Sequence, residues 1–208
     1  MSETVTLYTN PMSRGRIARW MLEETGVPYD VHLLDYGTTM KAPDYMAINP
    51  MGKVPALVHG TTVVTEAAAI CAYLADAFPA AGLAPPSTDS RRGPYYRWLF
   101  FAAGPIEAAV TDRALGIQVP ADKRVMVGYG DYDAMLNALE GAVSGGDYIL
   151  GDMFSAADVY LGAQIGWGLQ FGTIERRPAF ETYWARLEQR PAWRRTNALD
   201  DALAAGRV

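Results

Sequence analysis

The sequence is poor in the side chains that bind metals or form cross-links. Its 208 residues include one cysteine, Cys71, and two histidines, His32 and His59. A single cysteine excludes an internal disulfide, and two histidines with one thiol leave no cysteine or histidine set for a metal. We therefore expect neither a disulfide-stabilised fold nor a metal centre.

Basic residues are also in the minority. Lys and Arg number 18 against 23 Asp and Glu, and the formal net charge is −5. Nucleic acids and acidic membranes are bound by clustered Lys and Arg, so the composition argues against both partners. No stretch approaches the roughly 20 apolar residues of a membrane span, and the N-terminus lacks a secretion signal, which predicts a cytoplasmic protein.

Hydrophobic residues are plentiful, at 50%, so the chain has enough apolar surface for a substantial core. The first part alternates strand and helix patterns, and a strand–helix–strand order implies parallel pairing. A turn signal between two later strands implies a hairpin. The expected elements are strands at 5–9, 29–34, 55–58 and 62–65, and helices at 14–25 and 67–78.

The second part of the chain shows only helical patterns. A segment rich in proline, glycine and small polar residues separates the two parts. We expect an α/β domain at 1–79, a linker at 80–90 and an all-helical domain at 91–208, with helices at 91–115, 121–143, 155–170, 178–190 and 192–205.

The stretch MGKVPALV, residues 51–58, places a proline at the start of a short strand. If the bond between Val54 and Pro55 is cis, the N–H and C=O of Val54 can face outward and hold another peptide in strand fashion. The alternative is that Pro55 simply begins an edge strand.

Three motifs together carry a family resemblance. GKVPAL (52–57), TEAAAI (65–70) and FSAADVYLG (154–162), in this order and at this spacing, resemble the cytosolic glutathione transferase family over nearly the whole chain, specifically bacterial members with a serine-type active site. The resemblance implies a thioredoxin-like α/β domain followed by an all-α domain. It also implies glutathione as co-substrate, a homodimer, and a role in detoxification.

The resemblance assigns the glutathione contacts residue by residue. Pro55 is the cis-proline, and the backbone of Val54 pairs with the cysteinyl unit. Glu66 binds the γ-glutamyl ammonium and the N–H of Ala67 binds its carboxylate, although many members carry serine there. Lys53 reaches the glycyl carboxylate. The alternatives are a solvated Lys53 and, for Glu66, ordinary charge compensation at a helix start.

The catalytic step requires a thiolate, because a free thiol with a pKa near 8.5 is only slightly ionised at neutral pH. In TNPMSRGR, residues 9–16, Ser13 stands where a hydroxyl can donate to sulfur beside a helix N-terminus. By resemblance we predict Ser13 as the activating residue. Asn10 and Tyr8 are the alternatives, and Ser13 also suits a plain helix cap.

The predicted electrophile pocket is lined by aromatic and apolar side chains beside a helix interrupted by Gly104-Pro105, where proline removes a hydrogen bond and kinks the helix. The alternative is that these side chains fill the core. The function implied is conjugation of glutathione to a small hydrophobic electrophile; a glutathione-dependent isomerase, dehalogenase, lyase or peroxidase, or a binding module, are the alternatives. The candidate residues are Met12, Trp98, Phe101, Trp167 and Phe171.

A capping box precedes the helix expected at 155–170. Ser155 and Asp158 stand three residues apart, so the hydroxyl and the carboxylate can each satisfy an amide of the other residue. The helix that follows is apolar on all sides, which predicts that it is buried. We assign Asp158 a structural role only.

Overall fold

The structure is a computed structural model that describes residues 3–206. The chain divides into two compact units. Residues 3–82 and 189–206 belong to the first unit, and residues 83–188 form the second. The sequence analysis assigned 91–208 to one helical domain, whereas here the last helix belongs with the N-terminal residues.

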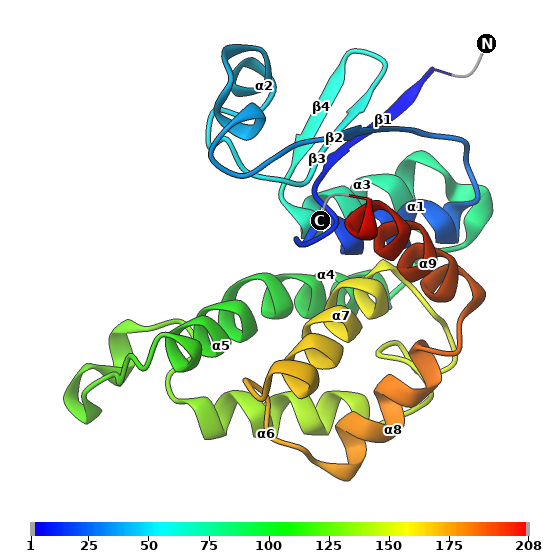
Figure 1. Ribbon diagram of the computed structural model, residues 1–208. Helices are drawn as coiled ribbons and strands as arrows, with labels where there is room; N and C mark the ends of the chain where they lie inside the picture. Colours follow the sequence, from blue (N-terminus) through cyan, green and yellow to red (C-terminus); the bar gives the residue numbers. More distant parts are fainter. Residues whose placement is uncertain (1–2, 207–208) are drawn as a thin grey trace. The chain divides into compact units, whose positions relative to one another are not determined.

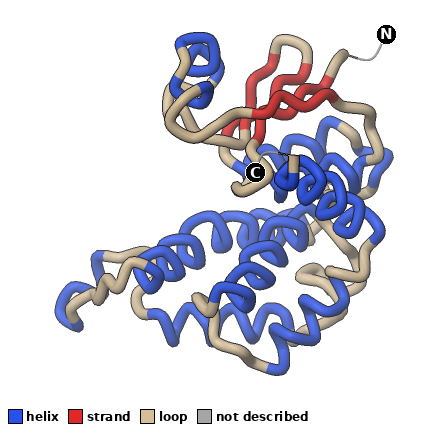
Figure 2. The backbone as a smooth tube through the Cα atoms, viewed as in Figure 1, coloured by secondary structure: helices blue, strands red, loops and turns tan. Residues whose placement is uncertain are grey.

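The first unit contains a four-stranded mixed sheet in the order β2-β1-β3-β4, drawn in red in Figure 2. β1 (Val5–Thr9) pairs in parallel with β2 (Asp30–Leu33) and antiparallel with β3 (Ala56–His59). β3 and β4 (Thr62–Thr65) form the antiparallel hairpin. The predicted strand–helix–strand unit and hairpin are confirmed.

Helices α1 (Gly15–Thr25) and α3 (Ala67–Ala77) pack together on one face of this sheet (Figure 1). α9 (Pro191–Ala205) packs on α1, where the rings of Trp193 and Trp20 lie 4.8 Å apart. This aromatic contact explains why the last helix joins the first unit.

A segment between β2 and β3 was not expected to be helical. This segment forms η1 (Thr39–Lys41) and α2 (Pro43–Ile48). Another short helical turn, η2 (Pro79–Ala81), follows α3. Three or six helical residues are too few for a periodic apolar pattern to show in the sequence. Their buried side chains form a small core with the other sheet face, made of Leu34, Met40, Tyr45 and Ala56, against which Tyr8 packs.

The second unit is helical throughout its named elements (Figure 1). α7 (Ala156–Phe171) is buried along most of its length and contacts α4 (Arg92–Phe101) and α8 (Pro178–Leu187), as its apolar sequence predicts. The capping box of Ser155 and Asp158 is confirmed. The elements are α4 (Arg92–Phe101), η3 (Ala102–Ile106), α5 (Glu107–Ala114), η4 (Ala121–Met126), α6 (Tyr132–Val143), α7 (Ala156–Phe171) and α8 (Pro178–Leu187).

The helix expected at 121–143 is two elements, so that prediction is wrong in its continuity. η4 ends at Met126, and Gly130 takes a φ of 68°, a left-handed conformation that a helix does not accommodate. Asp131 then caps α6, its carboxylate accepting the N–H of Ala134 at 2.8 Å. The glycines of GYGD therefore break the helix.

Candidate active site

The loop between β1 and α1 carries the serine predicted to activate the thiol. Ser13 is half-buried, and its Oγ accepts the N–H of Gly15 at 2.9 Å. The same hydroxyl donates its proton to the carbonyl oxygen of Asn10 at 2.6 Å. α1 has no acidic residue in its first turn, so the positive end of its dipole is not offset there. A ligand sulfur can receive the proton only when the hydroxyl releases the Asn10 carbonyl.

Both alternatives to the serine are engaged in structural contacts. Asn10 is buried; its Nδ2 donates to the carbonyl of Leu34 at 2.7 Å, and its Oδ1 accepts the N–H of Met12 at 2.9 Å. The ring of Tyr8 stacks on His32 with centroids 5.0 Å apart, and the residue is half-buried in the small core. These contacts favour structural roles for Asn10 and Tyr8.

Arg16 holds residues 10–14, the serine loop, through hydrogen bonds of its guanidinium. Its Nε donates to the carbonyl of Pro11 at 2.6 Å, and its terminal nitrogens donate to Asn197 at 3.2 Å and to Asp201 at 2.6 Å. The carboxylate of Asp201 therefore neutralises this guanidinium. Arg14, the other cation of the loop, is exposed.

The loop that precedes β3 contains the cis peptide bond considered in the sequence analysis. The bond between Val54 and Pro55 is cis, and β3 begins at Ala56. Val54 thus lies before the first residue of the sheet ladder, with its side chain half-buried. Its peptide groups are not committed to the register that pairs β3 with its neighbours.

Several hydrogen bonds hold residues 49–55, the proline loop, in place. The carbonyl of Lys53 accepts the Tyr45 hydroxyl at 2.5 Å and the Asn49 Nδ2 at 2.8 Å, while the Lys53 side chain is exposed. The ammonium of Lys41 donates to the carbonyl of Gly52 at 2.8 Å. Gly52 has a φ of 56°, which favours glycine. The backbone around Lys53 is therefore held tightly while its ammonium stays in solvent.

The start of α3 holds the third predicted segment. Glu66 is exposed and has a φ of 67°, a left-handed conformation that is strained for a residue with a side chain. Its carbonyl accepts the N–H of Ile70 at 2.9 Å, and Ala67, the first residue of the helix, is buried. Non-glycine residues in such conformations cluster at ligand sites. The turn at Glu66 is thus a feature that periodicity in the sequence does not reveal.

The register of the strands brings the serine loop, the proline loop and the turn at Glu66 to one end of the sheet. Tyr8 pairs with Ala56, and Ala56 pairs with Thr65. The serine loop follows the end of β1, the proline loop precedes the start of β3, and the turn at Glu66 follows the end of β4. Because β3 is antiparallel to β1 and β4, the start of β3 lies beside the ends of its two neighbours, and all three segments meet at the same end of the sheet.

The residues predicted to line the electrophile pocket are divided between the two units. Met12, in the first, is 71% exposed. In the second, Trp98 is buried and meets Phe101 edge to face at 5.3 Å. Trp167 is half-buried on α7, and Phe171, at its end, is 71% exposed. The structure therefore pairs Trp98 with Phe101, and the pocket remains a prediction.

The predicted interruption near Pro105 takes the form of a π-helical turn. Residues 102–106 form η3, with Pro105 inside it. Proline cannot supply an N–H to the helix ladder, and a widened turn accommodates the missing bond. Nearby, the carboxylate of Glu107 accepts the Tyr160 hydroxyl at 3.0 Å. The turn begins directly after Phe101.

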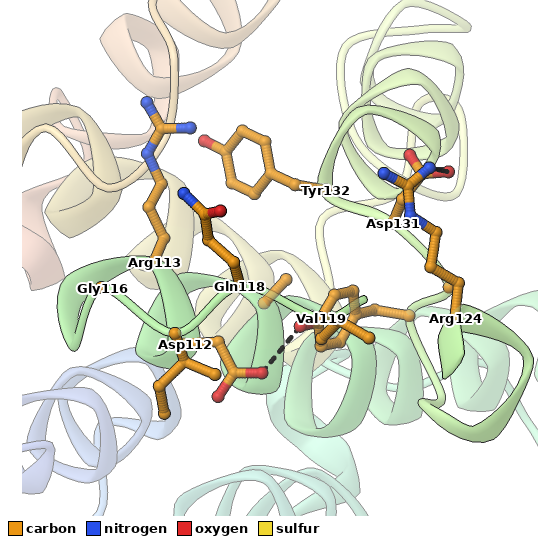
Figure 3. A pocket seen from close by; sticks show the side chains of 12 residues that line it. Asp112, Arg113, Gly116, Gln118, Val119, Arg124, Asp131 and Tyr132 are labelled. Carbon is orange, nitrogen blue, oxygen red and sulfur yellow. Dashed lines mark hydrogen bonds and ion pairs between the residues drawn. The ribbon is translucent and has the colours of Figure 1, made fainter. Parts of the chain in front are cut away.

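A cavity of about 370 Å³ lies elsewhere in the second unit, at the end of α5 and the start of α6 (Figure 3). Tyr129 donates to Asp112 at 2.7 Å, and this hydrogen bond raises the pKa of Tyr129 to about 12. The guanidinium of Arg113 lies 4.4 Å from the ring centre of Tyr132. None of the predicted site residues lines this cavity. Its polar lining includes Asp112, Arg113, Gln118, Arg124, Tyr129, Asp131 and Tyr132.

Residues 3–206 contain neither a group of side chains suited to a metal ion nor a helix suited to cross a membrane. In that range, no three histidine, cysteine or acidic side chains are grouped as a metal would require. No helix within the same range combines the length and apolarity needed to cross a membrane.

Comparison with known proteins gives matches to one family. Residues 12–77 match the family model described as "Glutathione S-transferase, N-terminal domain". Over most of its length the chain is similar to glutathione transferases. A glutathione S-transferase of Xanthomonas campestris is 26% identical, with 87% of this chain and 91% of that protein covered. Glutathione S-transferase F10 of Arabidopsis thaliana is 28% identical, with 93% and 96% covered.

Solved structures of the family share the fold. A glutathione transferase from Methylococcus capsulatus superimposes with a TM-score of 0.79 at 29% identity and covers 96% of this chain and 100% of its own. A sphingomonad glutathione S-transferase complexed with glutathione gives a TM-score of 0.76 at 28% identity, with 94% and 98% covered. The predicted thioredoxin-like and all-helical architecture is confirmed.

Proposed function

We propose that this chain is a glutathione transferase, that it binds glutathione at the end of the sheet formed by the serine loop, the proline loop and the turn at Glu66, and that it activates the thiol for attack on a small hydrophobic electrophile. The observation that carries the proposal is the strand register, which brings these three segments to one end of the sheet. The glutathione bound in the sphingomonad relative supports the choice of ligand.

Each segment supplies a different part of the tripeptide site. The peptide groups of Val54 pair with the cysteinyl unit in strand fashion. The free amide end of α3 at Ala67 receives the γ-glutamyl carboxylate, and the exposed carboxylate of Glu66 receives the ammonium. The exposed ammonium of Lys53 reaches the glycyl carboxylate.

The thiol is activated by a change of hydrogen-bond acceptor. In the free protein the Ser13 hydroxyl donates to the carbonyl of Asn10. When glutathione binds, the hydroxyl donates to the sulfur, which stabilises the thiolate beside the positive end of α1. Lowering the thiol pKa by about two units corresponds to about 2.7 kcal/mol. A hydrogen bond to a charged acceptor together with a helix dipole supplies energy of this size.

The candidates for contacts with the electrophile stay those predicted from the sequence: Met12 in the first unit, and Trp98, Phe101, Trp167 and Phe171 in the second. Aromatic rings of this kind bind apolar ligands through large contact areas. The thiolate sulfur forms the new bond to the electrophilic carbon, and the leaving group departs with the displaced electron pair, or a proton adds to the neighbouring carbon in a Michael addition. A panel containing one aryl halide, one enone and one hydroperoxide distinguishes conjugation from peroxidase chemistry.

The decisive test is an ultraviolet titration of bound glutathione from about pH 5 to about pH 10, comparing the wild type with Ser13→Ala. We expect the thiol pKa to be lowered in the wild type and to return toward about 8.5 in the variant. A thiolate signal that the substitution leaves unchanged would assign activation to another group. Absence of the signal from both proteins would favour a binding module without thiol activation.

We also propose that the enzyme is a homodimer. Tyr96 and Phe100 lie one turn apart on α4, are 41% and 71% exposed, and have ring centres 6.4 Å apart. Exposed aromatic side chains of this kind are typical of protein interfaces. Light scattering should give twice the chain mass, and Phe100→Asp should shift the population toward monomer; a monomeric wild type would contradict the proposal.

A further inference from the structure

We infer that Asn10 is a positioning residue that determines where the Ser13 hydroxyl points, and that Thr9 takes over as hydrogen-bond donor to Asn10 when this hydroxyl turns to a ligand. The inference rests on the proposed activation by Ser13. The sequence suggested Asn10 only as a direct donor to sulfur, whereas its observed contacts tie its side chain to Leu34 and Met12.

Asn10 is 6% exposed and takes part in four hydrogen bonds, of which three are short. Its Nδ2 donates to the carbonyl of Leu34 at 2.7 Å, next to the end of β2. Its Oδ1 accepts the N–H of Met12 at 2.9 Å, which closes a turn around Pro11. Its main-chain oxygen accepts the Ser13 hydroxyl at 2.6 Å.

This arrangement links the serine to the sheet through a single residue: the main-chain oxygen of Asn10 holds Ser13, and its side chain holds Leu34. The N–H of Leu34 also donates to the carbonyl of Thr9 at 2.9 Å, so the parallel strands β1 and β2 remain tied where the loop begins. Without the Asn10 amide, the buried carbonyl of Leu34 and the partly buried N–H of Met12 would lose their partners, and the loop would relax to satisfy them. The hydroxyl of Ser13 would move with it.

Thr9 supplies the second part of the inference. Its Oγ1 is fully buried and already directed at the main-chain oxygen of Asn10, at the long distance of 3.5 Å. When the Ser13 hydroxyl donates its hydrogen bond to sulfur instead, the Thr9 hydroxyl can shorten its own bond to the same carbonyl. The buried oxygen then keeps a donor, which lowers the cost of turning Ser13 toward the ligand.

The chain provides a matched control in the proline loop. Asn49 is 4% exposed; its Oδ1 accepts the N–H of Met51, two residues on, at 3.1 Å, and its Nδ2 donates to the carbonyl of Lys53 at 2.8 Å. Asn10 and Asn49 therefore lose the same kinds of bonds on substitution by alanine. Only Asn10 is bonded to the serine.

The experiment measures the thiol pKa of bound glutathione by ultraviolet titration and its affinity by calorimetry in Asn10→Ala, Ser13→Ala, the double variant and Asn49→Ala. We expect Asn10→Ala to raise the thiol pKa by about one unit, which is a tenfold loss of thiolate at low pH. The double variant should match Ser13→Ala alone, because Asn10 acts through Ser13. Asn49→Ala should weaken glutathione binding and leave the thiol pKa unchanged.

Thr9→Val keeps the shape of the buried side chain and removes its hydroxyl, so it should raise the thiol pKa less than Asn10→Ala does. If Asn10→Ala does not fold, Asn10→Ser is used; serine can still accept the N–H of Met12, and an intermediate pKa is expected. A wild-type thiol pKa in the Asn10 variant, or a further rise in the double variant, overturns the positioning role of Asn10. A wild-type pKa in Thr9→Val overturns the donor exchange. A wild-type pKa in Ser13→Ala overturns the proposed activation itself.

Discussion

The serine loop, residues 10–14, and the proline loop, residues 49–55, are built from the same parts. Each begins with a buried asparagine whose Oδ1 accepts the amide two residues later. Each is also held by a cation that donates to loop carbonyls, Arg16 to Pro11 in one and Lys41 to Gly52 in the other. Similar parts thus support two loops with different purposes.

The loops differ in the group that they present. The serine loop fixes a side-chain hydroxyl, whereas the proline loop fixes the backbone near Val54. A hydroxyl can be removed by one substitution, while backbone groups survive any change of side chain. The comparison predicts that catalysis is easily lost through the serine loop, and that binding through the proline loop is lost only when the backbone itself moves.

The largest expected effect compares two glycines, Gly15 directly after the serine loop and Gly52 within the proline loop. A Cβ at Gly15 would overlap the buried Thr9 hydroxyl, so Gly15→Ala should lower the free energy of unfolding by about 3 kcal/mol. A Cβ at Gly52 would lie 2.9 Å from the Met40 carbonyl oxygen, and φ is positive, so Gly52→Ala should cost about 2 kcal/mol.

Denaturant unfolding checks this order, with Gly26→Ala as control. Gly26 has a φ of 70° and, among the described residues, no atom within 4 Å of the added Cβ, so it reports the conformational cost alone, about 1 kcal/mol. A smaller loss for Gly15→Ala than for the control would show that the serine loop adapts freely.

A second prediction concerns pH and the helix pair behind the serine loop. Arg19 Nε lies 3.2 Å from Asp200 Oδ1, with side chains 3% and 1% exposed. Burial raises the pKa of Asp200 to about 6, although Arg19 and Arg16 lower it, and Asp201 raises it. The folded state therefore binds this proton more tightly than the unfolded state. The contribution of protonated Asp200 to the free energy of unfolding is complete below about pH 4 and is lost as the pH rises through about 6.

This loss should amount to about 2 kcal/mol between pH 4 and pH 7. Asp200→Asn removes the titrating group and should flatten the curve of unfolding free energy against pH by that amount. Equal slopes for the variant and the wild type would show that Asp200 stays ionised throughout the range.

The cations that hold the two loops should differ in strength. Arg16 also bonds Asn197 and Asp201 on α9, whereas the hydrogen bonds of Lys41 within residues 3–206 go to the carbonyls of Met51 and Gly52. We expect Arg16→Ala to cost about 2 kcal/mol and Lys41→Ala about 1 kcal/mol in unfolding experiments. Equal losses would show that α9 adds nothing to the serine loop.

The smallest effect is expected from Tyr8→Phe. The ring, which stacks on His32, is retained, and only the hydroxyl is removed. The free energy of unfolding should change by less than about 0.5 kcal/mol, and the thiol pKa of bound glutathione should not change. A raised thiol pKa would instead make Tyr8 the activating residue.

The sequence predicted the elements with strong periodic or turn signals. The strand at 5–9 and the apolar helix α7 are confirmed. The alternation of apolar residues in the strand and the almost wholly apolar sequence of the helix can both be seen in the order of the residues. α2 was missed because six residues carry too little pattern. The break at Gly130 was missed although the stretch GYGD, residues 128–131, is a turn signal in the sequence.

The candidate site was predictable in part. The motifs singled out Ser13, Val54-Pro55 and Glu66, and the cis bond is present. The hydrogen bond from Ser13 to Asn10 and the left-handed turn at Glu66 were not predictable, because each depends on contacts that only the folded loop creates. The roles of these residues remain predictions that the titrations above test.

The grouping of α9 with the N-terminal residues has a consequence for the order in which the protein is made. Because α9 covers α1, the ring of Trp20 and the guanidinium of Arg19 reach their observed surroundings only after residues 189–206 have left the ribosome. The sheet and the serine loop are synthesised early, but the helix on which the serine depends is covered last. A nascent chain halted before residue 189 would therefore expose this apolar surface to chaperones.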